Sequence, residues 1–232
     1  IKENEPQLYA TIDRIFLPGD YIAYRFSGIP QTTIGGLSEG IFWDFEKKQR
    51  SAVTSRIFDF DASLFPEVVP TVGFQCEVSQ EASVLTGIPK GTPITYRAGD
   101  QPNNALSLGV FENGEVAATG GTSGVVYAVT DQLIYDPSER INAFAHTNYS
   151  AENQRIGLLM CINGTGIQYA WLRKLLAPNS SYEELEQKAQ SAPIGAKGLV
   201  ALPFGNGAER IFQNQPVGAH LNGIDFNRHG AE

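Results

Sequence analysis

The amino-acid sequence predicts an α/β fold in which helices pack on a mixed sheet. Two β-rich runs, 116–119 and 124–129, are joined by a glycine turn. A third β-rich run at 157–162 precedes a clear helical pattern at 168–176. A strand–turn–strand unit followed by a further strand and a helix is typical of a sheet covered by helices. The hydrophobic content of 42% and charged content of 18% are those of a globular chain.

The N-terminal part of the sequence predicts short helices separated by turns. Residues 3–14 carry apolar side chains at helical spacing. Asp20 is expected to cap a second helix over 21–26, which Gly28 ends. The remaining expected elements of this part are helices at 51–58, 79–85 and 103–110 and a strand at 92–98.

Charge and cysteine content limit the classes of partner. The net charge of −8 argues against a nucleic acid or an anionic membrane surface, which call for a basic protein. Cys76 and Cys161 lack metal-type spacing, so we expect a reduced cytoplasmic chain. No apolar run approaches the roughly 20 residues that cross a bilayer. His146, His220 and His229 show no ligand spacing and are expected to be structural or surface residues.

Asp100 is the first candidate for chemistry. It follows Gly99 at the predicted end of the 92–98 strand, where its carboxylate would meet little side-chain crowding. A carboxylate in a cleft can serve as a general base that takes the proton of an alcohol. Gln101 beside it adds a polar group able to hold sugar hydroxyls. The alternative is a solvated aspartate that starts a turn or caps the next helix.

The glycine turn at 119–124 is the second candidate. Glycines let backbone N–H groups converge on an anion, and the hydroxyls of Thr122 and Ser123 add donors. An ordinary hairpin turn is the alternative. The turn is not a P-loop, a dinucleotide fingerprint or a nucleophile elbow, since the residues that each motif requires are missing.

Two further glycine-rich segments carry polar residues. Residues 163–166 join a strand to a helix, a junction that can present amides to a phosphate or only cap the helix. In the loop at 202–210, Glu209 and Arg210 are expected to form an ion pair or to anchor the loop.

Taken in order, these motifs resemble the FGGY carbohydrate kinases, and xylulokinases in particular. The likeness covers nearly the whole chain: 17–28, 32–45, 98–101, 119–126, 161–172 and 202–210. The resemblance implies an actin-like ATPase (ribonuclease-H-like) fold of two domains, here partial. Residues 1–98 would be the C-terminal part of the sugar-binding domain, and residues 99–232 the N-terminal part of the ATP-binding domain.

The resemblance also implies roles for single residues. Asp100 would be the base that deprotonates the attacking sugar hydroxyl, and Gln101 a sugar contact. Gly121, Thr122 and Ser123 would face the β- and γ-phosphates of ATP. Gly164 and Gln168 would contact the nucleotide. The implied cofactors are ATP and Mg²⁺, and the implied reaction converts D-xylulose to D-xylulose 5-phosphate in the cytoplasm, in a possible homodimer.

Several alternatives remain open at this point. The sugar could be that of a gluconokinase, a ribulokinase or a glycerol kinase. The chain could also belong to an actin-like nucleotide-dependent switch without sugar transfer, or to a degenerate kinase that senses sugar. The family's first phosphate loop would precede Ile1 and its adenine-binding glycine motif would follow Glu232. We therefore expect a fragment, and expect that the 232 residues alone are inactive.

Overall fold

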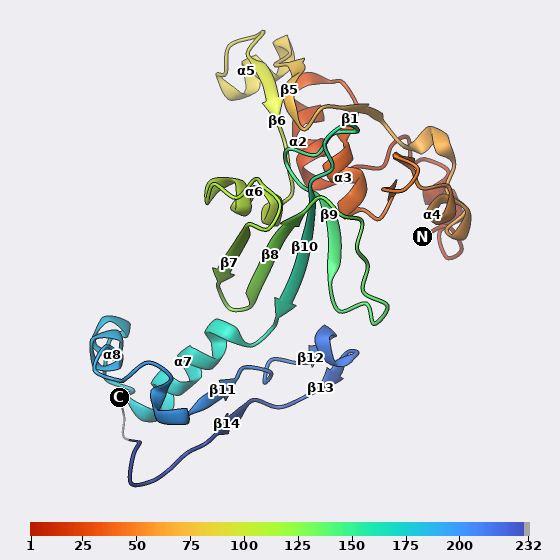
Figure 1. Cartoon of the computed structure of the whole chain (residues 1–232). Helices are drawn as coiled ribbons and strands as arrows, with labels where there is room; N and C mark the ends of the chain where they lie inside the picture. The colour runs from red at the N-terminus through yellow and green to blue at the C-terminus, as the bar shows by residue number, and fades with distance from the viewer. Residues whose placement is uncertain (230–232) are drawn as a thin grey trace. The chain divides into compact units, whose positions relative to one another are not determined.

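The computed structural model describes residues 1–229 and divides the chain into two compact units (Figure 1). Unit 1 comprises Ile1–Ala117, Ala128–Ile134 and Ala143–Leu158. Unit 2 comprises Ala118–Tyr127, Tyr135–Asn142 and the residues from Leu159 onward. Within the described range, no helix combines the length and the apolar character needed to span a lipid bilayer.

The first two helices of unit 1 differ in how well the sequence predicts them. Helix α1 (Pro6–Tyr9) is much shorter than the predicted 3–14, and none of its residues is buried. An amphipathic helix without packing on its apolar face is marginal, which explains the shortening. Helix α2 (Pro18–Ser27) is confirmed, and it ends at Gly28 with a left-handed φ of 77°. Asp20 does not cap it, because this carboxylate lies inside the helix and is buried.

Strand β1 (Gln31–Thr33) leads directly into helix α3 (Ile34–Glu39). β1 pairs in parallel with β4 (Glu67–Val69), and the Thr33 hydroxyl caps α3 by accepting the Gly36 N–H at 3.1 Å. Between β1 and β4 lie the antiparallel strands β2 (Trp43–Asp44) and β3 (Gln49–Arg50), helix α4 (Ala52–Ile57) and the 3-10 helix η1 (Ala62–Leu64). The short helix predicted at 51–58 is thereby confirmed as α4.

An antiparallel pair, β5 (Val72–Glu77) and β6 (Pro93–Tyr96), leads the chain to the candidate base. Helix α5 (Gln80–Thr86) connects the two strands, as predicted from its terminator Gly87, whose φ is 77°. Helix α6 (Asp100–Ser107) follows β6 after a short connection. The strand predicted at 92–98 and the helix predicted at 103–110 both exist, but the strand is shorter at both ends and the helix begins and ends three residues earlier.

A four-stranded sheet follows, with the strand order β7-β8-β10-β9 (Figure 1). Its strands are β7 (Val116–Gly120), β8 (Gly124–Thr130), β9 (Asn142–Ala145) and β10 (Ile156–Ile162). The three predicted strands are confirmed, and β9 was not predicted. In unit 1, Ala145, Tyr149 and Ile156 form a buried cluster against which Trp43 and Phe45 pack.

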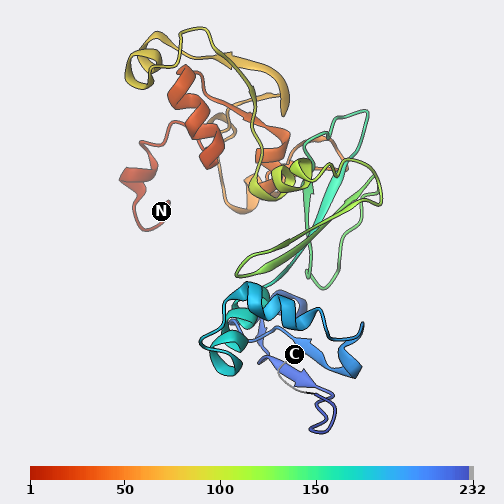
Figure 2. The ribbon, with the colours of Figure 1, turned by 90° about the vertical axis from the view of Figure 1, so that its left-hand side faces the viewer.

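In unit 2, helices α7 (Thr165–Leu176) and α8 (Tyr182–Ala189) lie side by side (Figure 2). The rings of Tyr169 and Tyr182 are 5.3 Å apart, and the Arg173 guanidinium lies 4.8 Å from the Tyr182 ring centroid. The other elements of this unit are η2 (Ala196–Gly198), β11 (Val200–Leu202), β12 (Ala208–Glu209), η3 (Arg210–Phe212), β13 (Gln215–Pro216) and β14 (His220–Asn222). β11 pairs with β14 and β12 with β13, both antiparallel.

Candidate functional site

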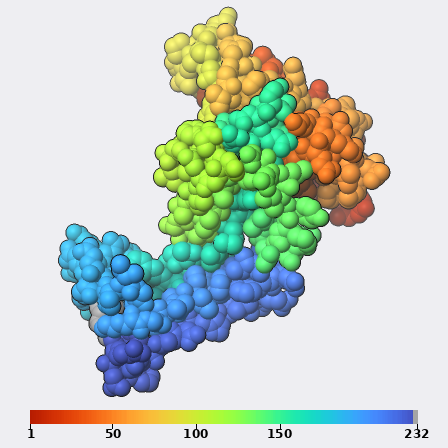
Figure 3. Space-filling view, in the orientation of Figure 1, coloured from red at the N-terminus to blue at the C-terminus, as the bar shows by residue number. Residues whose placement is uncertain are grey.

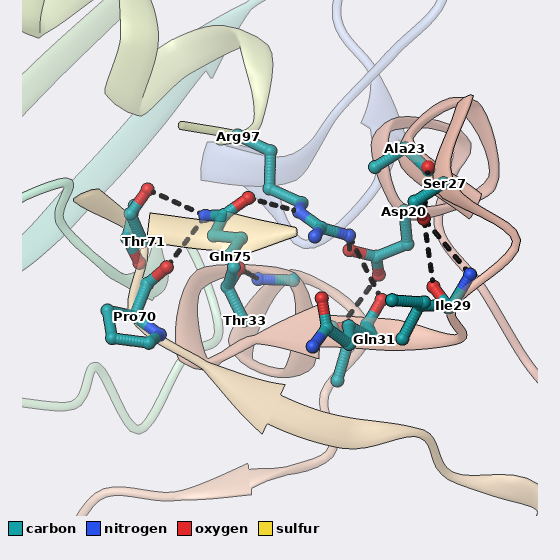
Figure 4. A network of polar contacts seen from close by, with 12 residues as sticks. Asp20, Ala23, Ser27, Ile29, Gln31, Thr33, Pro70, Thr71, Gln75 and Arg97 are labelled. Carbon is teal, nitrogen blue, oxygen red and sulfur yellow. Dashed lines mark hydrogen bonds and ion pairs between the residues drawn. The ribbon is translucent and has the colours of Figure 1, made fainter. Parts of the chain in front are cut away.

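Arg97 and Asp20 form a buried ion pair in unit 1 (Figure 4). Arg97 donates through Nη1 to Asp20 Oδ1 at 3.3 Å and to the Gln31 carbonyl at 3.0 Å. The Thr32 hydroxyl donates to the other Asp20 oxygen at 2.8 Å. Burial raises the pKa of Asp20, while the Thr32 hydrogen bond and the charge of Arg97 oppose the rise. The pair therefore joins α2, β1 and the connection that precedes α6.

Gln75 holds the other edge of the Arg97 guanidinium. Its Oε1 accepts from Arg97 Nε at 2.9 Å, and its Nε2 donates to the carbonyls of Pro70 at 2.7 Å and Thr71 at 3.1 Å. Arg97 is only 8% exposed, yet its Nη2 has no hydrogen-bond partner among residues 1–229. A buried donor without a partner costs free energy, so this nitrogen is a place where a ligand oxygen would be stabilised.

A pocket of about 310 Å³ lies beside this ion pair within unit 1. Its volume falls in the range of small-molecule sites. Its lining residues come from the start of α2, from α3 and from the connection between β6 and α6: Leu17, Pro18, Gly19, Asp20, Thr33, Gly36, Glu39, Arg97, Ala98, Gly99 and Asp100. The pocket thus brings together side chains that are far apart in the sequence.

Asp100, the candidate base, lines this pocket as the first residue of α6. The sequence was interpreted as a strand end here, but β6 ends at Tyr96 and Gly99 caps the helix. Asp100 is exposed, and both its carboxylate oxygens accept from Gln101, Oδ1 from the backbone N–H at 2.7 Å and Oδ2 from Nε2 at 3.5 Å. The yellow-green residues of α6 are visible at the surface in Figure 3. Negatively charged side chains are favoured in the first turn of a helix.

Glu39 is a pocket residue that the sequence reasoning missed. It ends α3, and its Oε1 is buried without a hydrogen-bond partner in the described part of the chain. Burial and, to a smaller extent, the charge of Asp100 raise the pKa of Glu39 to about 7. A backbone hydrogen bond from Gly99 acts in the opposite direction and lowers this pKa. A Cβ at Gly99 would overlap the Glu39 carboxylate. Nothing in the local sequence reveals this contact, because it depends on tertiary structure.

In unit 2, the turn between β7 and β8 is bonded to the start of α7. The Thr122 carbonyl accepts the N–H groups of Gly166 at 3.1 Å and Ile167 at 3.3 Å. The Ser123 hydroxyl donates to the Asn163 carbonyl at 3.3 Å. The structure therefore brings the predicted turn residues next to the strand–helix junction at 163–166. Two N–H groups at the start of α7 are thereby occupied by protein rather than left for a phosphate.

Close backbone approach explains the glycines of this region. A Cβ at Gly166 would overlap the Gly121 carbonyl, and one at Gly164 would overlap the Pro203 carbonyl. At Gly124, a Cβ would overlap the Thr165 side chain. From the sequence alone, the glycines of this region indicate an anion-binding turn. The structure adds a packing requirement that holds with or without a ligand.

Gln168 and Glu209 complete this region. Gln168 lies in the first turns of α7, and its Nε2 is buried with no hydrogen-bond partner within residues 1–229. Glu209 is fully buried, and both its oxygens accept the Asn163 N–H at 3.2 Å. Glu209 therefore anchors its loop, as expected. Arg210 donates elsewhere, to the Glu139 carbonyl and the Asn142 side chain.

Comparison with known proteins finds one family in sequence and in structure. Residues 1–107 match the N-terminal domain of the FGGY family of carbohydrate kinases. The xylulose kinase of Haemophilus influenzae is 29% identical over 229 residues, which is 97% of this chain and 44% of that protein. The xylulose kinase of Bacillus subtilis is 24% identical over 225 residues, with the same coverages of 97% and 44%.

Solved structures agree with the sequence comparison. The xylulose kinase from Rhodospirillum rubrum superposes with a TM-score of 0.84 at 27% identity, covering 100% of this chain and 46% of that one. The gluconate kinase from Lactobacillus acidophilus, at 19% identity and a TM-score of 0.82, shares the fold. The chain spans less than half the length of each of these proteins.

These likenesses confirm the family and the fold that the sequence motifs implied. The fold is the actin-like α/β architecture of carbohydrate kinases, present here in part. Residues 1–107 match the N-terminal domain of the FGGY family of carbohydrate kinases, and the whole chain is similar to xylulose kinases in sequence and fold.

Proposed function

We propose that the full-length protein transfers a phosphoryl group from ATP to a sugar hydroxyl, with D-xylulose as substrate and D-xylulose 5-phosphate as product. The observation that carries this proposal is the position of Asp100 in a pocket of about 310 Å³. Asp100 also lies inside the segment that matches the FGGY model. The choice of D-xylulose is supported by relatives that are xylulose kinases, of which this chain spans under half.

Asp100 acts in this proposal as the general base. Its Oδ2, which accepts only a long hydrogen bond of 3.5 Å from Gln101 Nε2, takes the proton of the primary hydroxyl as that oxygen attacks phosphorus. Its other oxygen is held by the Gln101 N–H at 2.7 Å, which fixes the orientation of the carboxylate. The Gln101 side chain contacts a second sugar hydroxyl. We assign residues 1–98 to the sugar-binding domain and residues 99–232 to the ATP-binding domain, a boundary that lies nine residues before the end of the N-terminal-domain match at residue 107.

The residues of the β7–β8 turn fit a nucleotide phosphate chain. Gly121 and Thr122 are exposed, Ser123 brings a hydroxyl, and the buried Gln168 Nε2 is a donor without a partner among the described residues. We therefore assign Gly121, Thr122 and Ser123 to the phosphates, and Gly164 and Gln168 to the nucleotide. When bound, ATP with Mg²⁺ supplies the phosphoryl group and neutralises its developing charge.

The metal-ligating side chains of this chain indicate how Mg²⁺ would be bound. Residues 1–229 contain no group of three or more His, Cys, Asp or Glu that could hold a metal ion. Mg²⁺ in phosphate sites needs only one or two protein carboxylates, because phosphate oxygens and waters complete its coordination. We therefore expect the nucleotide to carry most of the Mg²⁺ ligands, and this chain to orient the sugar and the phosphates.

A coupled ADP-release assay of the full-length protein tests the proposal. The panel contains D-xylulose, D-ribulose, D-gluconate and glycerol, with a sugar-free sample that detects an actin-like switch. Asp100→Asn should lower turnover by about 10²–10⁴-fold, the usual contribution of a general base. The matched control is Asp131→Asn, which neutralises an exposed carboxylate outside the pocket. Parent-level activity of Asp100→Asn would refute the assignment, and sugar-independent ADP release would favour the switch.

A further inference from the structure

The pocket beside Asp100 contains more acceptor groups than the proposed base alone. Three carboxyl groups line it, those of Asp20, Glu39 and Asp100, together with one guanidinium, that of Arg97. The charge of Arg97 is matched by Asp20 at 3.3 Å. Two carboxyl groups, those of Glu39 and Asp100, are therefore left without a cation in the pocket lining.

Two polar atoms at this pocket are left without hydrogen bonds in the described part of the chain. Glu39 Oε1 is buried and can accept, and Nη2 of the 92% buried Arg97 is buried and can donate. A ligand that satisfies both must offer donors and acceptors at once. A hydroxyl group does so, since it carries one O–H donor and two lone pairs. A ligand carboxylate offers acceptors only and brings a charge of the same sign as Glu39 and Asp100.

We propose that Glu39 is a specificity-determining residue of the sugar pocket, which binds a hydroxyl of a neutral polyol or ketose and discriminates against sugar acids. This inference rests on the proposed function for the identity of the pocket, and it deepens that function by naming the substrate class. The close contact with Gly99 fixes Glu39 beside the proposed base, since the glycine leaves room for the carboxylate where any Cβ would overlap it.

Because Glu39 can gain or lose a proton, the discrimination against sugar acids should depend on pH. The groups facing it are Asp100 on α6, Asp20 on α2 and Arg97 on the connection before α6. Burial and the Asp100 charge bring the pKa of Glu39 to about 7. A neutral sugar accepts a hydrogen bond from the protonated acid and donates one to the carboxylate, so its binding tolerates both states. A sugar acid is repelled once Glu39 loses its proton.

Calorimetric titration of the full-length protein without ATP tests the inference between pH 6 and 8.5. The probes are D-xylulose, the neutral pentitol xylitol and the five-carbon sugar acid D-xylonate. We expect D-xylonate to bind the parent more weakly than D-xylulose, and its affinity to fall by up to about tenfold per pH unit above pH 7. Glu39→Gln, which mimics the protonated acid, should abolish this slope.

Controls and contrary outcomes separate this inference from the proposed function. Glu46→Gln, a change at an exposed glutamate outside the pocket, should keep the parent pH slope. A pH-independent D-xylonate affinity in the parent, or an unchanged slope in Glu39→Gln, overturns the role of Glu39. The parent measurement stands even where the variant fails to fold. Neutral sugar binding without any ADP release contradicts the kinase proposal and leaves the role of Glu39 intact.

Discussion

Replacing Arg97 by methionine tests the polar network that underlies the pocket. The substitution keeps most of the aliphatic length and removes the guanidinium. It deletes hydrogen bonds to Gln75 Oε1 at 2.9 Å, to the Gln31 carbonyl at 3.0 Å and to Asp20 at 3.3 Å. Asp20 then remains in the interior, 4% exposed, and keeps the hydrogen bond from the Thr32 hydroxyl.

The expected loss is large because a buried charge loses its partner. Removing one member of a buried ion pair typically costs about 3–5 kcal/mol in the free energy of unfolding. Replacing both members should cost less, since no isolated charge remains. We therefore expect Arg97→Met to be destabilised by about 3–5 kcal/mol and the double variant Asp20→Asn with Arg97→Met to recover part of that loss.

The loss should depend on pH in a defined direction. The folded pKa of Asp20 is raised above its ordinary value of 3.8, chiefly by burial. A carboxyl group of this kind binds its proton more tightly in the folded state, so its contribution to stability falls as pH rises from 3.8 to the folded pKa. Without the Arg97 charge that lowers it, this pKa rises further. The deficit of Arg97→Met should therefore be smallest in acid and grow as pH rises through that wider window.

Urea denaturation of the full-length protein, followed by far-ultraviolet circular dichroism at several pH values, measures these effects. The four proteins of the cycle are the parent, Asp20→Asn, Arg97→Met and the double variant. A loss below about 1 kcal/mol for Arg97→Met, or additive effects of the two changes, would show that the ion pair does not stabilise the fold as described.

Two glycine substitutions examine the close contacts of the two candidate regions. Gly99→Ala should displace the flexible Glu39 carboxyl group and raise the KM for the sugar about tenfold with little change in Tm. The control Gly218→Ala, which has open space around its Cβ and lies outside the pocket lining, should leave both unchanged. An unaltered KM in Gly99→Ala would contradict the contact. Gly166→Ala must move backbone at Gly121 and should destabilise the fold by about 1–3 kcal/mol and weaken ATP binding, measured by denaturation and nucleotide titration. Parent-like ATP affinity would argue that the turn does not contact the nucleotide.

The sequence predicts those helices whose capping residues lie next to them along the chain. Gly28 and Gly87 both adopt left-handed conformations at the ends of predicted helices. Ser51 and Ser79 cap α4 and α5 with their hydroxyls. Each of these interactions lies within a few residues along the chain, so the sequence window that predicts it also contains its partner.

Side chains whose roles depend on distant partners are harder to predict. Asp20 was expected to cap a helix, because nothing near it in sequence reveals Arg97, 77 residues further along the chain. Glu39 gave no signal for the same reason, since its pocket is completed by Gly99 and Asp100. Asp100 is a candidate base because its motif resembles that of a family. Its position at the start of a helix, in contrast, does not follow from that motif.

The short connection between β6 and α6 begins at Arg97 and leads directly to Asp100, the first residue of α6, and these two residues differ in their surroundings. The guanidinium is immobilised by interior contacts, whereas the carboxylate three positions later stays accessible to solvent. The contacts of Arg97 thus set the position of the proposed base, which makes few contacts of its own. We therefore expect that Asp100 can be replaced with little change in the fold, and that changes at Arg97 move the carboxylate of Asp100.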